Sequence, residues 1–441
     1  MKLWGKQALP EMPTTLWLVS SLGSSTPNGG APSILLVSSN DERMREGEKT
    51  TMPFPPDPIA AVIHSDPYPY YAELVASKPI YRDETLGLWV ASSAAMVRAV
   101  LTSAICRVRP PAEPIPRALL GSPAATIFGH LVRWNDGEQH GPCKQAVQAS
   151  MQSIEERSTA ELGRKWARFL LGESQPQTAS RLQDFAFHLP VYVIASLLGV
   201  PQEELHHTAL WVSEYVRCLA PASTPAQLEQ GKSASRHLLD LFRALLSRHQ
   251  AGLDNSLLAG LAWEAKRAGC EETETIVANG IGFLSQAYEA TAGLIGNTVV
   301  ALATHRNVRE QVAADPSLLR LVIEEVLRYD PPAQNTRRYL AQNGHVAGQV
   351  MQEGDGILVV LAAANRDPSL NPNPEQFDIQ RKDRQMFTFG AGPHSCPGET
   401  LAALIAQAGV EQLMASGADL EQLAATVVYR PSVAVRVALL S

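Results

Sequence analysis

The stretch 387-FTFGAGPHSCPGE-399 decides the fold of this 441-residue chain. Cys396 stands directly before Pro397, and a helical pattern of apolar residues follows as far as about Ser416, with Gly417 as its C-cap. Because proline suits the first position of a helix, we expect Cys396 at or beside the N-cap. There the free N–H groups and the helix dipole stabilise a thiolate, so the sequence predicts a reactive sulfur at a helix start.

Glycines surround this cysteine and allow the backbone to approach a flat or bulky group closely. They are Gly390, Gly392 and Gly398. Phe389 can shield one side of the sulfur. For a lone Cys-Pro-Gly, the alternative is an ordinary glycine-rich turn with a structural cysteine. A zinc site that uses His394 and Cys396 is disfavoured, because two further ligands at metal spacing are missing.

The full spacing Phe389-x-x-Gly392-x-His394-x-Cys396-x-Gly398 resembles the haem-binding signature of the cytochrome P450 family. The resemblance implies that Cys396 is the proximal thiolate ligand of haem b (iron protoporphyrin IX). It also places Phe389, Gly390 and Gly398 beside the cofactor. It assigns His394 to a haem propionate. A thiolate ligand pushes electron density onto the iron and favours O–O cleavage.

Glu325-Val-Leu-Arg328 has the i,i+3 spacing that places both side chains on one helix face. Taken alone, such a pair is usually a solvated surface ion pair of little worth. Its context resembles the family's ExxR helix, which supports the core near the haem. The family often completes this pair with an arginine in a later segment. This chain has Gln376 there, so the third partner is left open.

Two further segments resemble the elements that bind the haem propionates in the family. In residues 335–338, the resemblance favours Arg338, with Arg337 as the alternative. Upstream, His140 matches the histidine of the family's H-x-x-x-R helix, and Lys144 stands where arginine is common. Lysine offers a point charge to a carboxylate but loses the bidentate fork of arginine.

Residues 276–305 resemble the family's long central helix, whose usual pattern is Ala/Gly-Gly-x-acid-Thr. Ala287 keeps a small residue at the oxygen cleft, and Glu289 matches the acid. Ala290 occupies the alcohol position, and Thr291 follows one residue late, which turns its side chain by ~100°. Glu289 and Thr291 are the candidate catalytic residues. We expect Glu289 and ordered water, or a substrate hydroxyl, to deliver protons, while Thr291 points elsewhere; a salt bridge is the alternative role for Glu289.

The expected architecture is mainly α with a small β-rich portion, the cytochrome P450 fold, with haem between the central helix and the cysteine-loop helix. Residues 1–51 are rich in Ser, Pro and Gly, so we expect a disordered or weakly ordered extension before a single domain at 52–441. Within that domain, apolar periodicity predicts mainly helix from 137 to 329. Residues 79–92 predict a hairpin, and 356–364 are strand-like. Five prolines make 109–123 a long loop.

Composition excludes some partners. The formal charge of −7, without a dense Lys/Arg run, argues against nucleic acid. The five cysteines are scattered without a CxxC pair, so we expect a reduced, cytoplasmic protein. Residues 276–303 are long enough to span a bilayer, but their Asn, Gln and Glu side chains favour a buried helix and no membrane anchor.

The resemblance implies a soluble, bacterial-type monooxygenase that inserts one atom of O2 into a small organic substrate. No flavin or iron–sulfur segment is visible, so a ferredoxin and an NAD(P)H-dependent reductase are the expected electron donors. The loop at 109–123 and helices at about 190–250 should shape a pocket for a lipophilic or natural-product-like molecule. The alternatives are a peroxide-using or atypical oxidative haem enzyme, and a non-enzymatic haem or ligand-binding protein.

Overall fold

The computed structural model describes residues 54–172, 179–250 and 256–440. The expected N-terminal extension, residues 1–51, lies outside the described residues. Contacts group Phe54–Leu219 with Ser223–Ser441 into one compact unit. In the described ranges, no helix is both long and apolar enough to cross a membrane.

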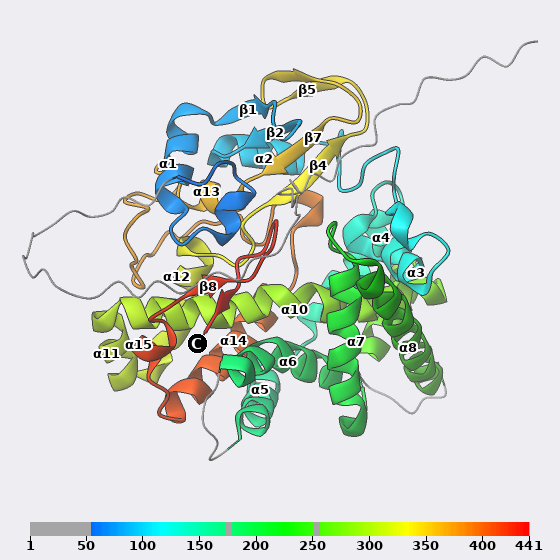
Figure 1. The fold of residues 1–441 in the computed structure, drawn as a ribbon. Coiled ribbons are helices and arrows are strands. Elements are labelled where there is room, and N and C mark those ends of the chain that lie inside the picture. The colour runs from blue at the N-terminus through cyan, green and yellow to red at the C-terminus, as the bar shows by residue number, and fades with distance from the viewer. Residues whose placement is uncertain (1–53, 173–178, 251–255, 441) are drawn as a thin grey trace, which may run out of the picture. The chain divides into compact units, whose positions relative to one another are not determined.

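Helices make up most of this unit, as the sequence predicts (Figure 1). Those before the central helix are α1 (Tyr68–Ser77), α2 (Ala94–Thr102), α3 (Pro123–His130), α4 (His140–Gln152), α5 (Glu156–Leu171), α6 (Ala179–Leu197), α7 (Leu205–Cys218), α8 (Pro225–Gln250) and α9 (Leu257–Ala268). The central helix is α10 (Thr273–Thr304). After it come α11 (Arg306–Ala314), α12 (Leu319–Tyr329), α13 (Leu361–Asn365), α14 (Glu399–Ala415) and α15 (Leu420–Leu423). Short 3-10 turns are η1 (Ala60–Ile63), η2 (Arg117–Leu119), η3 (Val132–Trp134), η4 (Gln202–Glu204), η5 (Pro316–Leu318) and η6 (Gly392–His394).

The strands form one mixed sheet and two small hairpins. The mixed sheet has the order β1 (Ile80–Asp83), β2 (Leu88–Ala91), β7 (Gly356–Val359), β4 (Thr336–Leu340), β3 (Cys106–Arg107). β1 and β2 are the predicted hairpin, with Ile80 opposite Ala91 and a turn that contains Gly87 at φ 63°. The small hairpins pair β5 (Gly344–Val346) with β6 (Gln349–Met351) and β8 (Val428–Tyr429) with β9 (Ala438–Leu439).

Two boundaries differ from the expectation. The strand-like segment 356–364 is a strand only as far as Val359, and its alanine-rich second half forms α13, because alanine is the best helix former. The cysteine-loop helix α14 begins at Glu399 with Gly398 as its N-cap, so Cys396 lies two residues before the cap. Gly417, at φ 74°, ends this helix as predicted.

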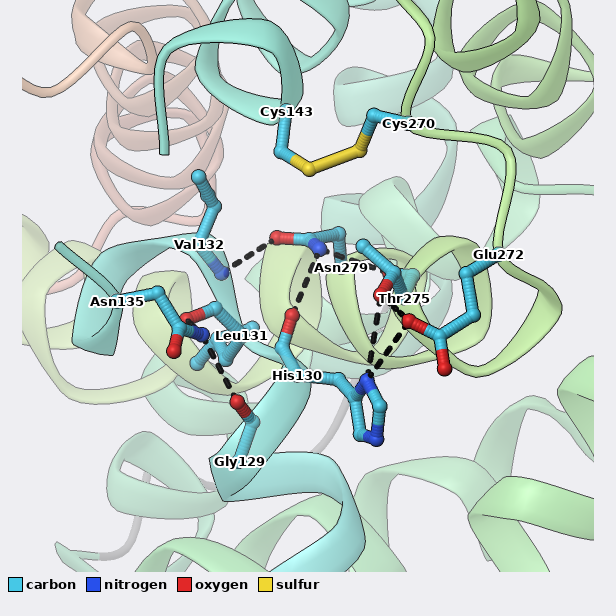
Figure 2. Close-up of a disulfide and its surroundings, with 10 residues drawn as sticks. All are labelled: Gly129, His130, Leu131, Val132, Asn135, Cys143, Cys270, Glu272, Thr275 and Asn279. Carbon is cyan, nitrogen blue, oxygen red and sulfur yellow. Dashed lines mark hydrogen bonds and ion pairs between the residues drawn. A yellow bond between two sulfur atoms is a disulfide. The ribbon is translucent and has the colours of Figure 1, made fainter. Parts of the chain in front are cut away.

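The expectation that all five cysteines are reduced is wrong for two of them. Cys143 and Cys270 form a disulfide, although 127 residues separate them in the sequence (Figure 2). The fold packs the first turn of α4 against α9 and brings the two Cα atoms to 5.5 Å, within bridging range. Spacing along the chain carries no signal for such a long-range pairing, so the sequence could not reveal it.

The core is built around α10. Figure 1 shows this helix running between the mixed sheet with α1 and α2 on one side and α5, α6 and α7 on the other. α10 packs against α3, α6, α8, α12 and α14. Its buried polar groups find partners: Asn297 donates to the carbonyl of Asp330 at 2.9 Å, and Asn279 accepts from the backbone N–H of Val132 at 3.0 Å. A helix buried on most of its faces can carry a site within the protein interior.

Candidate active site

The cysteine loop is held by its own backbone. The N–H of Cys396 donates to the carbonyl of Phe389 at 2.7 Å, and the N–H of Gly398 points at the Cys396 sulfur at 3.4 Å. Gly392 has φ 68°, and a Cβ there would lie 2.9 Å from the carbonyl oxygen of Leu101, so only glycine fits. The loop therefore presents an accessible, free thiol at a defined position.

A cavity opens above this thiol, between the cysteine loop and α10. The cysteine loop and α14 contribute Phe389, Cys396, Pro397, Gly398, Leu401, Ala402 and Ile405. α10 contributes Asn279, Phe283, Gln286, Ala287, Ala290, Thr291 and Leu294. No aspartate or glutamate of the described residues lines it, so the charged side chains in its wall are cations.

One end of the cavity carries the predicted histidines. The rings of His140 and His394 lie 4.2 Å apart, and His394 Nε2 lies 3.0 Å from Asp136 Oδ1. Burial, together with the neighbouring His394 and Lys144, lowers the pKa of His140 from 6.5 to about 4. Burial works to raise the pKa of Asp136, but the hydrogen bonds from His394 and the Val108 N–H outweigh it, and that pKa is lowered.

Predicted cations lie near the same end. Lys144 lines the cavity and donates to the carbonyl of Ser395 in the cysteine loop, and burial lowers its pKa. Arg338, on β4, is 5% exposed, and burial lowers its pKa to about 10. Arg337, the alternative, is less buried than Arg338, so burial favours the assignment to Arg338.

Arg133 is a functional candidate that sequence reasoning missed. It lies in η3 and lines the cavity with Lys144. Arg133 is an exposed residue; burial of its guanidinium lowers its pKa, and the Cys396 sulfur raises it. Arg133 also repels Arg338 electrostatically. A guanidinium in a cavity wall that holds no acidic side chain of the described residues indicates a site for an anion. In the sequence, only the position of Arg133 three residues before Asp136 could have indicated this role. That spacing belongs to none of the family motifs named above.

The Glu325–Arg328 pair is structural, and it is not a solvated surface pair. Both side chains are 0% exposed, and the Arg328 Nη2 to Glu325 Oε1 distance is 2.6 Å. Gln376 contributes only its backbone carbonyl, which accepts from Arg328 at 2.9 Å. Arg384 is the third partner, with its Nε 2.9 Å from Glu325 Oε2. The network thus replaces the missing arginine from a position eight residues later.

α10 places the two candidate catalytic residues differently. Glu289 does not line the cavity; its carboxylate accepts from Arg430 Nη1 at 2.8 Å, and both side chains are 27% exposed. Thr291 is 1% exposed and lines the cavity beside Ala290, which differs from the expectation that a one-residue offset turns it elsewhere. The lining face is wide enough to include neighbouring positions, and Gln286 lies on it one turn earlier.

The cavity fits a haem on this structure's own features. Its floor offers a free thiol, and one end offers cations without acidic partners in the wall. His140 Nε2 is buried and has no hydrogen-bond partner among the described residues. An orphaned buried nitrogen of this kind calls for a ligand group. In the described ranges, no group of three or more His, Cys, Asp or Glu side chains is placed to hold a metal ion.

Comparisons with known proteins agree with this geometry. The cytochrome P450 family model matches residues 215–415. The 20-oxo-5-O-mycaminosyltylactone 23-monooxygenase of Streptomyces fradiae is 28% identical over 92% of this chain and 93% of its own length. The biotin biosynthesis cytochrome P450 of Bacillus subtilis is 26% identical over 79% of this chain and 88% of its own length. The crystal structure of CalO2, 26% identical, superposes with a TM-score of 0.75 over 87% of this chain and 96% of its own.

The chain belongs to the cytochrome P450 family of haem-thiolate monooxygenases. The fold expected from the sequence is therefore confirmed: a mainly helical cytochrome P450 fold.

Proposed function

We propose that this monooxygenase binds haem b through Cys396 and hydroxylates a mid-sized lipophilic molecule of the natural-product class. The observation that carries the proposal is the free Cys396 thiol at the floor of an apolar cavity whose opposite wall is α10. A haem with a thiolate ligand supplies the activation of O2 and the insertion of one oxygen atom into the substrate.

The residues around the cavity have separable tasks. Cys396 would ligate the iron, with Phe389 beside it and Gly390 and Gly398 shaping the loop. His140, Lys144, Arg338 and His394 would bind the propionates. Ala287 and Ala290 have small side chains and would leave space next to the reacting centre. The apolar side chains of Phe283 and Leu294 would exclude water and orient the substrate.

The substrate class rests on the wall and on the relatives. The substrate-facing wall is largely apolar and presents no carboxylate from the described residues. Relatives include the tylactone monooxygenase of Streptomyces fradiae and a C-19 steroid 1alpha-hydroxylase of Sorangium cellulosum, 32% identical over 53% of this chain and 60% of its own length. Both names describe oxidation of large, lipophilic ring systems, and an apolar pocket suits such molecules.

Electrons would come from separate proteins in the cytoplasm. We expect a small ferredoxin and an NAD(P)H-dependent ferredoxin reductase as these electron donors. The second candidate function is peroxide-driven oxidation. It is favoured by Ala290, which removes the alcohol that usually helps to deliver protons when O2 is the oxidant.

Proton delivery is assigned within α10. Thr291 has the better position, since its side chain lies in the cavity wall beside Ala290. Glu289 could act only after its ion pair with Arg430 opens, because its carboxylate is engaged away from the wall. Gln286 can hold a water on the same face, one turn earlier.

The ligand assignment is tested first by spectroscopy. Cys396→Ser should lose the red-shifted Soret band of the reduced, CO-bound protein, whereas Cys218→Ser, at a buried free cysteine, should keep it. A Cys396→Ser protein that retained this band would overturn the assignment. Turnover of lipophilic substrates with NAD(P)H, ferredoxin and reductase is then compared with turnover driven by peroxide alone. Activity only with peroxide would favour the second candidate function.

A further inference from the structure

The Cys143–Cys270 disulfide joins two elements that form the haem site. Cys143 lies in the first turn of α4, three residues after His140 and one before Lys144. Cys270 follows Gly269, the left-handed C-cap of α9, and precedes the start of α10. The bond therefore links α4, which carries two propionate-binding candidates, to the segment just before the N-terminus of α10, which forms the opposite cavity wall.

Non-covalent contacts beside the disulfide join the start of α10 to the end of α3 and to η3, which precede α4. Figure 2 shows Asn279 of α10 reaching the loop between α3 and α4, where it contacts Val132 and His130. His130 in turn lies 3.5 Å from Glu272 and 3.2 Å from the Thr275 hydroxyl. None of these contacts involves the sulfur atoms, so we expect opening of the disulfide to loosen α4 without unfolding it.

A second cavity, of about 500 Å³, gives access to the disulfide. Its lining is polar and apolar in equal parts: Gly129, His130, Val132, Asn135, Gln139, His140, Cys143, Gly269, Cys270, Glu271, Glu272 and Thr275. The volume lies within the roughly 300–1,000 Å³ of small-molecule sites. Among these described residues there are two carboxylates and no lysine or arginine. The cavity thus suits a small, cationic or zwitterionic molecule, and both cysteines lie in its wall.

We propose that the Cys143–Cys270 bond is a redox-responsive clamp on haem binding, opened by a small thiol that enters this cavity. A thiolate attacks one sulfur, the S–S bond breaks, and the other cysteine leaves as a thiolate. A second thiolate attacks the mixed disulfide and releases the oxidised thiol dimer, so two electrons pass to the protein and two protons follow. The proposal needs the family's haem but not the substrate or electron donors proposed for turnover.

The clamp explains why a disulfide lies in a chain whose other cysteines are free. In reducing compartments, disulfides are usually transient or sensing rather than structural. α4 packs on α9, so we expect these helices to stay together in the oxidised and the reduced protein. Only the freedom of His140 and Lys144 to move would change. The oxidised state would hold the haem tightly, and the reduced state would release it faster.

The test uses the purified holoenzyme and measures haem transfer to excess apomyoglobin. Reduction by cysteamine, verified by alkylation and mass spectrometry at Cys143 and Cys270, should accelerate transfer on the order of 5- to 10-fold, as expected for weakening one or two hydrogen bonds. Cys143→Ser and Cys270→Ser should show the fast rate with or without cysteamine. Cys218→Ser is the matched control and should behave as the wild type.

Access through the cavity has its own test. Cysteamine, a cationic thiol, should reduce the bond faster than 2-mercaptoethanesulfonate after each rate is divided by its rate on a small model disulfide. Glu272→Gln should diminish that preference, and a thiol attached to a large polyethylene glycol should react slowly.

Unchanged haem transfer after verified reduction would overturn the clamp, and it needs no variant that might misfold. Equal normalised rates for both small thiols would overturn the access route. Neither result depends on turnover, so a failure of the proposed substrate class remains distinguishable.

Discussion

Two cations line one end of the cavity, and a third lies close to them. Lys144 of α4 and Arg133 of η3 line the cavity, whose wall holds no carboxylate of the described residues, and Arg338 of β4 lies near enough to Arg133 for their charges to repel. The family pattern identified two of them, because their spacing belongs to known motifs. Arg133 follows no such spacing, and only the fold brings it to the others. A lysine in place of the usual arginine leaves one guanidinium fork missing, and Arg133 can supply it.

Arg133→Met should weaken haem retention. Removing a cation that would bind a propionate costs about 1.5–3 kcal/mol, the range of charged hydrogen bonds, which is on the order of a 10- to 100-fold faster transfer of haem to apomyoglobin. Arg117→Met, at a side chain that is 79% exposed, is the control and should change nothing. A second comparison uses protoporphyrin IX and its dimethyl ester. If Arg133→Met accelerates the loss of both by the same factor relative to the wild type, the role of Arg133 as a propionate ligand is wrong.

His188 on α6 gives the molecule a pH dependence. Burial, with the nearby His206, lowers its pKa below the ordinary 6.5, although Asp184 works to raise it. The unfolded chain therefore binds this proton at a higher pH than the folded chain does. Stability is present in full above about pH 6.5 and falls as the pH drops, by up to ~1.4 kcal/mol per unit.

His188→Gln should remove this part of the acid sensitivity. Between pH 8 and pH 5.5 the Tm of the variant should fall less than that of the wild type, by on the order of 1–2 °C. His207→Gln, at an exposed histidine, is the control and should follow the wild type. Parallel Tm profiles for the wild type and His188→Gln would contradict the assignment.

At the scale of elements, α10 shows what a motif can and cannot predict. The helix and its small residue Ala287 follow from the sequence, since apolar periodicity and the family pattern agree there. The direction of the Glu289 side chain does not follow from the sequence, because its partner Arg430 is 141 residues away. Likewise, the ExxR pair was predictable from i,i+3 spacing, whereas its third partner Arg384 depends on how the chain before the cysteine loop folds back.

Thr291→Ala should therefore uncouple the enzyme more than Glu289→Gln does. General acid–base groups contribute about 10²–10⁴-fold, and a wall residue is better placed for this than a carboxylate engaged with arginine. Product formed per NAD(P)H consumed measures the effect, after haem content is matched. Arg430→Gln controls for the ion pair, which should be worth only about 0–1 kcal/mol at this exposure. A stronger loss in Glu289→Gln than in both other variants would return the proton route to Glu289.

At the scale of the whole molecule, the residues of the haem cavity all lie between Val132 and Ile405. The elements that frame it, from α3 to α14, pack on one another within the unit that begins at Phe54. The cysteine loop was predictable because its glycines and its Cys-Pro junction are local. The Cys143–Cys270 disulfide was not, because it joins elements that meet only in the folded chain.

Deleting residues 1–51 should leave haem content, the CO-bound Soret band and thermal stability unchanged. The segment has the composition of a chain that buries little apolar surface. We expect the Tm of the shortened holoenzyme to lie within about 2 °C of that of the full chain, which corresponds to less than roughly 1 kcal/mol. A deletion ending at residue 60 is the matched comparison, because it also removes Ile59, which packs against the buried cluster of Tyr71 and Leu74, and should lower the Tm further. An insoluble or haem-free product from the 1–51 deletion would show that the extension is part of the haem-binding domain.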